Sequence, residues 1–139
     1  MSIAQISVFS ESKPGHLSRV LAHFEEAGVS VRGYSLRDAG EYGIVRFIVD
    51  KPETALDALK QAGFACTMSQ VICLRLADVP GELARVVGIL ADCGINIIYS
   101  YSMISTYIVI SVSDLQAAEE LLASKPVDLV APDELASLR

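Results

Sequence analysis

The chain has 139 residues, of which 52% are hydrophobic and 20% are charged, and its formal net charge is −6 at pH 7. It carries enough apolar side chains to bury a core, which excludes a disordered tail. The acidic balance argues against nucleic acid and against an anionic membrane surface as partners, because both would repel the chain. The length suits one ordinary domain or two very small ones.

In the first half of the chain, apolar periodicity predicts four strands and two helices. The first helix has four apolar residues at the spacing of one helix face, and it stops at Gly28. The second helix begins at residues 51–54, with a proline near its first turn, and Gly63 ends it. The apolar face of the first helix consists of Leu17, Val20, Leu21 and Phe24. The strands are expected at 3–9, 29–37, 43–50 and 64–69, with a turn at 38–41.

The second half repeats this order of elements. A helix face with the same spacing as the first consists of Leu83, Val86, Val87 and Leu90. A second helix is expected at 115–124, and a short helical turn begins at 132–134. The strands are expected at 71–76, 95–103, 107–113 and 127–131.

An internal repeat explains this similarity. Pro14-Gly15 recurs as Pro80-Gly81, a shift of 80 − 14 = 66, and the surrounding residues follow it. Further on we align Ile44-Val45 with Ile108-Val109, so the shift falls to 64, as a two-residue deletion in a loop would produce. The fold class predicted is α+β: two ferredoxin-like βαββαβ modules, whose antiparallel sheets carry both helices on one face. We place the two domains at residues 1–69 and 70–139.

Helices on one face leave the other face of each sheet without a cover. The stretch 104–112 is apolar at successive positions, so it offers apolar side chains on both faces. An apolar face of that size is normally covered by a partner, and we therefore expect a homodimer or a larger assembly. Three cysteines, Cys66, Cys73 and Cys93, sit in apolar runs and are expected to be buried, reduced thiols of a cytoplasmic protein.

The turn before the first helix of each repeat is the most informative motif. Proline presets φ for a turn, and the following glycine lets the backbone approach a guest closely. The first N–H groups of the helix lack intrahelical acceptors and lie at the positive end of its dipole, so a carboxylate suits them. The alternative is an ordinary helix start in which Asp78 caps its own helix.

The second half resembles the ACT domain, in which a strand is followed by Asp-x-Pro-Gly-x-Leu, a helix and Gly-Ile-Asn-Ile. The resemblance covers nearly the whole chain, as two tandem copies. The resemblance implies allosteric binding of an amino acid against the Pro-Gly turn, at the interface between two ACT modules. Carried over to the second repeat, the ligand-binding residues are Asp78, Val79, Pro80, Gly81, Glu82, Leu83 and Asn96. In the first repeat they are Ser12, Lys13, Pro14, Gly15, His16, Leu17 and Ser30.

The two copies are unequal. Ser12 and Ser30 stand in the first repeat where Asp and Asn are usual, so we expect the second repeat to be the better site. Neither His16 nor His23 has a cysteine or carboxylate at metal-ligand spacing, so no metal and no other cofactor is expected. No nucleophile-base pair stands out either, and no catalytic residue is assigned.

The leading hypothesis is therefore a protein, not an enzyme, that senses an amino acid and passes the signal to a regulated enzyme partner. One alternative is a small enzyme on a ferredoxin-like scaffold with His16 in the chemistry. Another is a structural subunit of a larger complex. The sequence does not identify the amino acid.

Overall fold

The computed structural model describes residues 1–38 and 40–138. Ala39, in the turn expected at 38–41, and Arg139, the last residue of the expected second domain, lie outside the described residues. The contacts divide the chain into two compact units. The first unit is Ala4–Ser69 with Leu135–Leu138, and the second is Met1–Ile3 with Gln70–Glu134.

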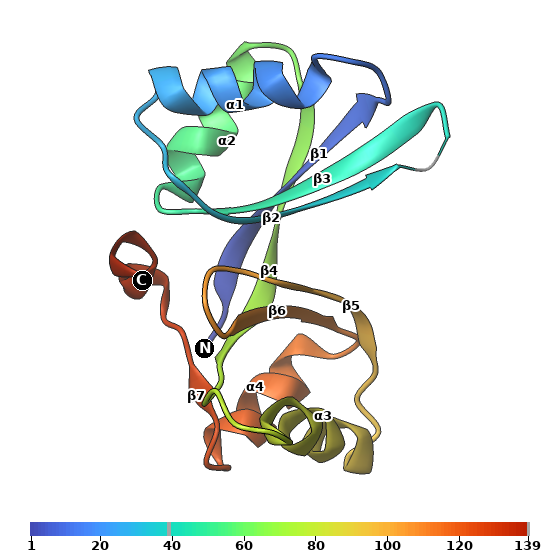
Figure 1. The fold of residues 1–139 in the computed structure, drawn as a ribbon, viewed down its shortest axis with the longest axis vertical. Coiled ribbons are helices and arrows are strands. Elements are labelled where there is room, and N and C mark those ends of the chain that lie inside the picture. Colours follow the sequence, from blue (N-terminus) through green and yellow to red (C-terminus); the bar gives the residue numbers. More distant parts are fainter. Residues whose placement is uncertain (39, 139) are drawn as a thin grey trace. The chain divides into compact units, whose positions relative to one another are not determined.

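The first unit is built from one four-stranded antiparallel sheet and two helices, both on the same face of the sheet (Figure 1). The strands lie in the order β2-β3-β1-β4. This is the order of a βαββαβ module, so the predicted fold class is confirmed for this unit. The elements are β1 (Ile3–Glu11), α1 (His16–Glu26), β2 (Val31–Asp38), β3 (Tyr42–Val49), α2 (Pro52–Gln61) and β4 (Ala65–Arg75).

The core of the first unit lies between this sheet and its helices. Val20 and Phe24 of α1 are buried, and the Phe24 ring meets the edge of Phe47 at 5.0 Å between centroids. Leu17 is half-buried and packs against the same core. Leu21, the fourth member of the predicted helix face, is 39% exposed. The helix meets the sheet along a narrower stripe than the apolar pattern indicates.

The second unit repeats the architecture with β4 as its first strand. β6 and β7 pair with β4, and β5 pairs with β6, all antiparallel. Its core residues on the helices include Val86, Leu90 and Leu122. The elements are α3 (Glu82–Asp92), β5 (Ile97–Ser102), β6 (Tyr107–Val112), α4 (Leu115–Ala123), β7 (Asp128–Leu129) and the 3-10 helix η1 (Pro132–Ser137).

Two of the predicted strands are a single strand in the structure. The segments expected at 64–69 and 71–76 form β4 without a break, and the strand passes from the first unit to the second between Ser69 and Gln70. The helical turn expected at 132–134 is the 3-10 helix η1.

Cross-strand pairing corrects the alignment of the repeats. Ile6 pairs with Phe47 in the first unit, and Ile72 pairs with Ile110 in the second. Because Ile6 and Ile72 match at a shift of 66, the third strands match at 110 − 47 = 63, and the shift of 64 is wrong by one residue. A slip of one residue moves every side chain to the other face of a sheet, which is why pairing fixes the register. The hairpin between β5 and β6 is therefore three residues shorter than that between β2 and β3.

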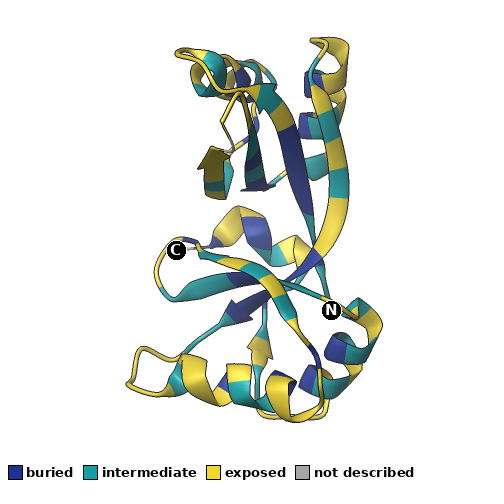
Figure 2. Ribbon diagram, turned by 90° about the vertical axis from the view of Figure 1, so that its right-hand side faces the viewer, coloured by how far each residue is buried: buried dark blue, intermediate teal, exposed yellow. Residues whose placement is uncertain are grey.

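Burial also revises the expected apolar surface (Figure 2). In the stretch 104–112, Val109 and Ile110 are buried and only Ile104, at 46%, is among the exposed large hydrophobic residues. The strand residues with the greatest apolar exposure in the first unit are instead Tyr34, Leu36 and Tyr42. The premise of an exposed apolar stretch at 104–112 is therefore wrong, while the expected homodimer stays a prediction.

Candidate functional site

Each Pro-Gly turn has the backbone of a type II turn. Gly15 has φ 85° and Gly81 has φ 87°, the left-handed region that this turn type requires at its third position. The turn is closed by the N–H of His16, which donates to the carbonyl of Lys13 at 3.3 Å. In the second repeat the N–H of Glu82 donates to the carbonyl of Val79 at 3.4 Å. The two repeats thus start their first helices in the same way.

The glycines are also the N-cap residues of α1 and α3, and neither helix has a side-chain cap. The alternative in which Asp78 caps its helix is therefore wrong. After His16, the next helical N–H group bound back to the turn is that of Arg19, at 3.0 Å from the Gly15 carbonyl. In the described residues, the N–H groups of Leu17 and Ser18 have no such partner and point out of the positive end of the helix dipole.

A cavity of about 290 Å³ lies beside the turn of the first repeat. One side is the segment that leads into α1, and the other is the β2-β3 hairpin. Among the predicted site residues, the cavity is lined by Ser12, Lys13, Pro14, His16 and Leu17. Sequence reasoning missed the remaining lining residues, which are Ser10, Glu11, Leu36, Arg37, Asp38, Gly43 and Val45.

The hairpin wall depends on a glycine. A Cβ atom at Gly43 would lie 2.9 Å from the carbonyl oxygen of Arg37, closer than real Cβ contacts occur. Gly43 therefore allows β2 and β3 to stay paired up to Asp38 and Gly43, next to the cavity. The three additional residues of this hairpin were the signal in the sequence that a wall exists on this side.

Charges of both signs surround the cavity. Glu11 and Lys13 form an exposed ion pair at 3.3 Å, and Arg37 and Asp38 line the opposite wall. The Asp38 carboxylate also accepts a hydrogen bond from the Gly40 N–H at 3.0 Å. Such a site offers partners for a carboxylate and for an ammonium group on the same ligand.

His16 contributes its ring to the packing under the turn. Its ring stands edge-on to Phe64, with centroids 5.7 Å apart. Both ring nitrogens are buried and have no hydrogen-bond partner among the described residues. A nitrogen without exposed surface does not meet a substrate atom, so this geometry does not favour His16 as a proton-transfer group.

Ser30 does not line the cavity of the first repeat, and Asn96 does not line the hollow found in the second repeat. The Ser30 N–H donates to the Asp50 carboxylate at 2.8 Å, and the Asn96 N–H donates to the Ser113 hydroxyl at 3.1 Å. Both residues tie the start of one strand to the end of the next. Gly15 is exposed and does not line the cavity of the first repeat.

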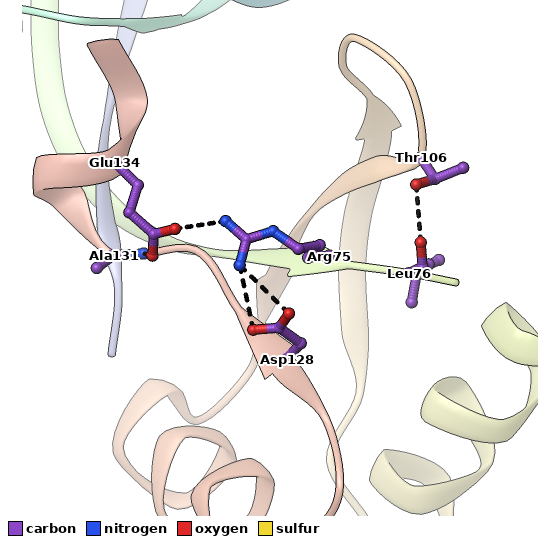
Figure 3. A network of polar contacts seen from close by, with 6 residues as sticks. All are labelled: Arg75, Leu76, Thr106, Asp128, Ala131 and Glu134. Carbon is purple, nitrogen blue, oxygen red and sulfur yellow. Dashed lines mark hydrogen bonds and ion pairs between the residues drawn. The ribbon is translucent and has the colours of Figure 1, made fainter. Parts of the chain in front are cut away.

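The second repeat has a different hollow. It lies on the side of β7, and Glu82 is the one predicted site residue among those lining it. Asp78, Val79, Pro80, Gly81 and Leu83 are exposed. Figure 3 shows Arg75 at this side of the unit, where its guanidinium binds Asp128 at 3.2 Å and also binds Glu134. The hollow is lined by Arg75, Leu76, Ala77, Glu82, Arg85, Pro126 and Asp128.

The thiols differ from the expectation. Cys73 is buried, Cys66 is half-buried and Cys93 is exposed at the end of α3, so the expected burial of Cys93 is wrong. Burial raises the pKa of the Cys73 thiol to about 12.

In the part of the chain that the structure describes, no three His, Cys, Asp or Glu residues are grouped as a metal site. Within the same residues, no helix is long and apolar enough to cross a membrane.

Comparison with known proteins agrees with this architecture. The family model described as an ACT domain pair matches residues 1–139. A crystal structure of a Bacteroides thetaiotaomicron protein is 33% identical, has a TM-score of 0.94, and the match covers 99% of this chain and 98% of that one. No curated protein matches the chain.

Two more distant structures have the same fold. The regulatory subunit of aspartate kinase from Thermus thermophilus is 22% identical with a TM-score of 0.64, and that from Thermus flavus is 21% identical with a TM-score of 0.62. The matches cover 87% of this chain in both cases, and 89% and 88% of the respective subunits.

Proposed function

The chain belongs to the ACT domain family as a pair of such domains, and we propose that it is a regulatory protein that binds an amino acid. The two ACT domains are taken as residues 1–69 and 70–139. The resemblance implies a ligand against the Pro-Gly turn. The aspartate kinase subunits of the same fold are regulatory by name, which supports a role in regulation rather than catalysis.

The cavity beside Gly15 is the observation that carries this proposal. It lies beside the start of α1, where N–H groups are unpartnered among the described residues, and it has an apolar floor and charged residues of both signs in its lining, which together suit an α-amino acid. The sequence favours the second repeat through Asp78 and Asn96, whereas the cavity of the first repeat is lined by five predicted site residues and the hollow of the second by Glu82 alone. We therefore assign the first repeat as the primary site and the second as a weaker one.

A thermal-shift screen of the full chain against the twenty amino acids tests the proposal. A ligand that binds only the folded chain stabilises it by about 2.7 kcal/mol at 100 times its dissociation constant. We expect a rise in Tm with one amino acid or a small related group. The absence of any shift at millimolar concentration would contradict amino-acid binding.

We further propose that the protein works as a homodimer, in the cytoplasm, on a regulated enzyme partner. The support for the dimer is the exposure of Phe9 and Tyr42, which by strand alternation lie on the face of the first sheet away from its helices, since exposed apolar surface commonly marks an interaction site. Sedimentation equilibrium should give twice the chain mass of 14.9 kDa. A single-chain mass at micromolar concentration would rule the dimer out.

A further inference from the structure

The wall of the cavity in the first repeat indicates which ligand side chain fits there. Leu36 of β2 pairs with Val45 of β3 across the strands, so both side chains point to the same face of the sheet. Val45 is 2% exposed and forms the floor, while Leu36 is 56% exposed and stands beside the open space. Leu17, at the start of α1, lines the cavity from the helix.

The charges around this wall balance. Glu11 and Arg37 alternate with Ser10 and Leu36, so their side chains point to the other face of the sheet. Lys13 and Asp38 remain as the cation and the anion that line the cavity. A zwitterion finds a partner for each of its charges there, whereas an additional side-chain charge would have to lie against the apolar wall. Placing a charge against apolar surface without a partner is costly.

The volume suits a small ligand. At about 290 Å³ the cavity is at the lower end of the range for small-molecule sites, which run from about 300 to 1,000 Å³. A ligand of the size of valine or leucine fits within this volume.

From these three observations we propose that the cavity lined by Leu17, Leu36 and Val45 selects an L-α-amino acid with a short aliphatic side chain. The inference rests on the proposed amino-acid binding and adds the class of the side chain. The ligand carboxylate faces Lys13 and the start of α1. Its ammonium group faces Asp38, and its side chain covers Leu36.

Isothermal titration calorimetry with the full chain compares leucine, isoleucine and valine with lysine and glutamate. We expect the aliphatic amino acids to bind at least about tenfold more tightly than the charged ones. Isoamylamine lacks the carboxylate and 4-methylpentanoate lacks the ammonium group, so both should bind at least about tenfold more weakly than leucine. Equal binding of either analogue would overturn the need for a zwitterion.

Two charge-matched variants test the wall. Leu36→Glu places a negative charge beside the ligand side chain and should weaken leucine binding at least about tenfold. Ile98→Glu makes the same change on β5 in the second unit, where Ile98 is 61% exposed, and should leave the affinity within about twofold. Equal losses in both variants would overturn the assignment to this cavity. Leu36→Ala, which should bind leucine more weakly than the wild type, replaces Leu36→Glu if circular dichroism shows that the glutamate variant is unfolded.

The outcomes separate the two levels of the proposal. If lysine or glutamate binds as tightly as leucine, the aliphatic class is overturned and amino-acid binding stands. If none of the twenty amino acids binds, both fail together.

Discussion

Arg75 shows how one side chain joins three segments of the second unit. Its guanidinium binds Asp128 on β7 and Glu134 on η1 (Figure 3). It also lies over the Tyr107 ring, 5.6 Å from the centroid. Glu134 in turn accepts a hydrogen bond from the N–H of Ala131 at 2.9 Å. The two contacts hold the pKa of the Glu134 carboxyl below its ordinary value, with the Ala131 N–H as the larger cause.

Glu134→Gln tests this carboxylate. Because the folded-state pKa is lowered, the charge stabilises the fold above the unfolded pKa of about 4.3, and this stabilisation is lost as the pH falls through the folded pKa. Glutamine keeps an acceptor for the Ala131 N–H but has no charge for Arg75. Urea unfolding should therefore show the wild type more stable at pH 7, with the difference shrinking below about pH 4. A difference that does not change with pH would contradict a role for the charge.

At the scale of elements, local patterns predicted most of the fold. Both helix starts followed from the Pro-Gly turns, and the strands followed from short β-branched runs bounded by turn residues. The pairing register did not follow, because Ile44 and Val45 are both apolar, as are Ile108 and Val109. A single sequence cannot tell which of two adjacent apolar residues faces the helices, whereas the partner strand can. The cavity depends on that register and on the longer hairpin, so its far wall was missed.

The turn that starts α3 can be tested with two glycines. Gly81 has φ 87° and open space where a Cβ would stand, so Gly81→Ala costs only the left-handed backbone, about 1–2 kcal/mol. Gly88 lies inside the same helix, also with open space, and Gly88→Ala should stabilise the fold by about 0.5–1 kcal/mol. Chemical denaturation measures both changes in the free energy of unfolding. Two variants that change stability in the same direction would contradict a left-handed requirement at Gly81.

At the scale of the whole molecule, the compact units do not coincide with continuous stretches of sequence. Met1–Ile3 belongs to the unit formed by Gln70–Glu134, and the N-terminal ammonium group binds Glu119 in that unit at 2.7 Å. Leu135–Leu138 belongs to the first unit, where Arg32 donates to the carbonyl of Ala136 at 2.7 Å. Each unit is therefore completed by a short segment from the opposite end of the chain.

This exchange predicts that the C-terminal residues stabilise the first unit. Leu135 is 1% exposed and Leu138 is 3% exposed, and truncating a buried leucine to alanine costs about 2–5 kcal/mol. Leu135→Ala and Leu138→Ala should each lower the free energy of unfolding accordingly, whereas Leu83→Ala, at a site 44% exposed, should cost less than either. Hydrogen exchange locates the effect. Amide protection should fall first in β2 of the first unit, because Arg32 on that strand binds the C-terminal segment. A loss of protection confined to β5 of the second unit would show instead that the C-terminal segment stabilises its own repeat.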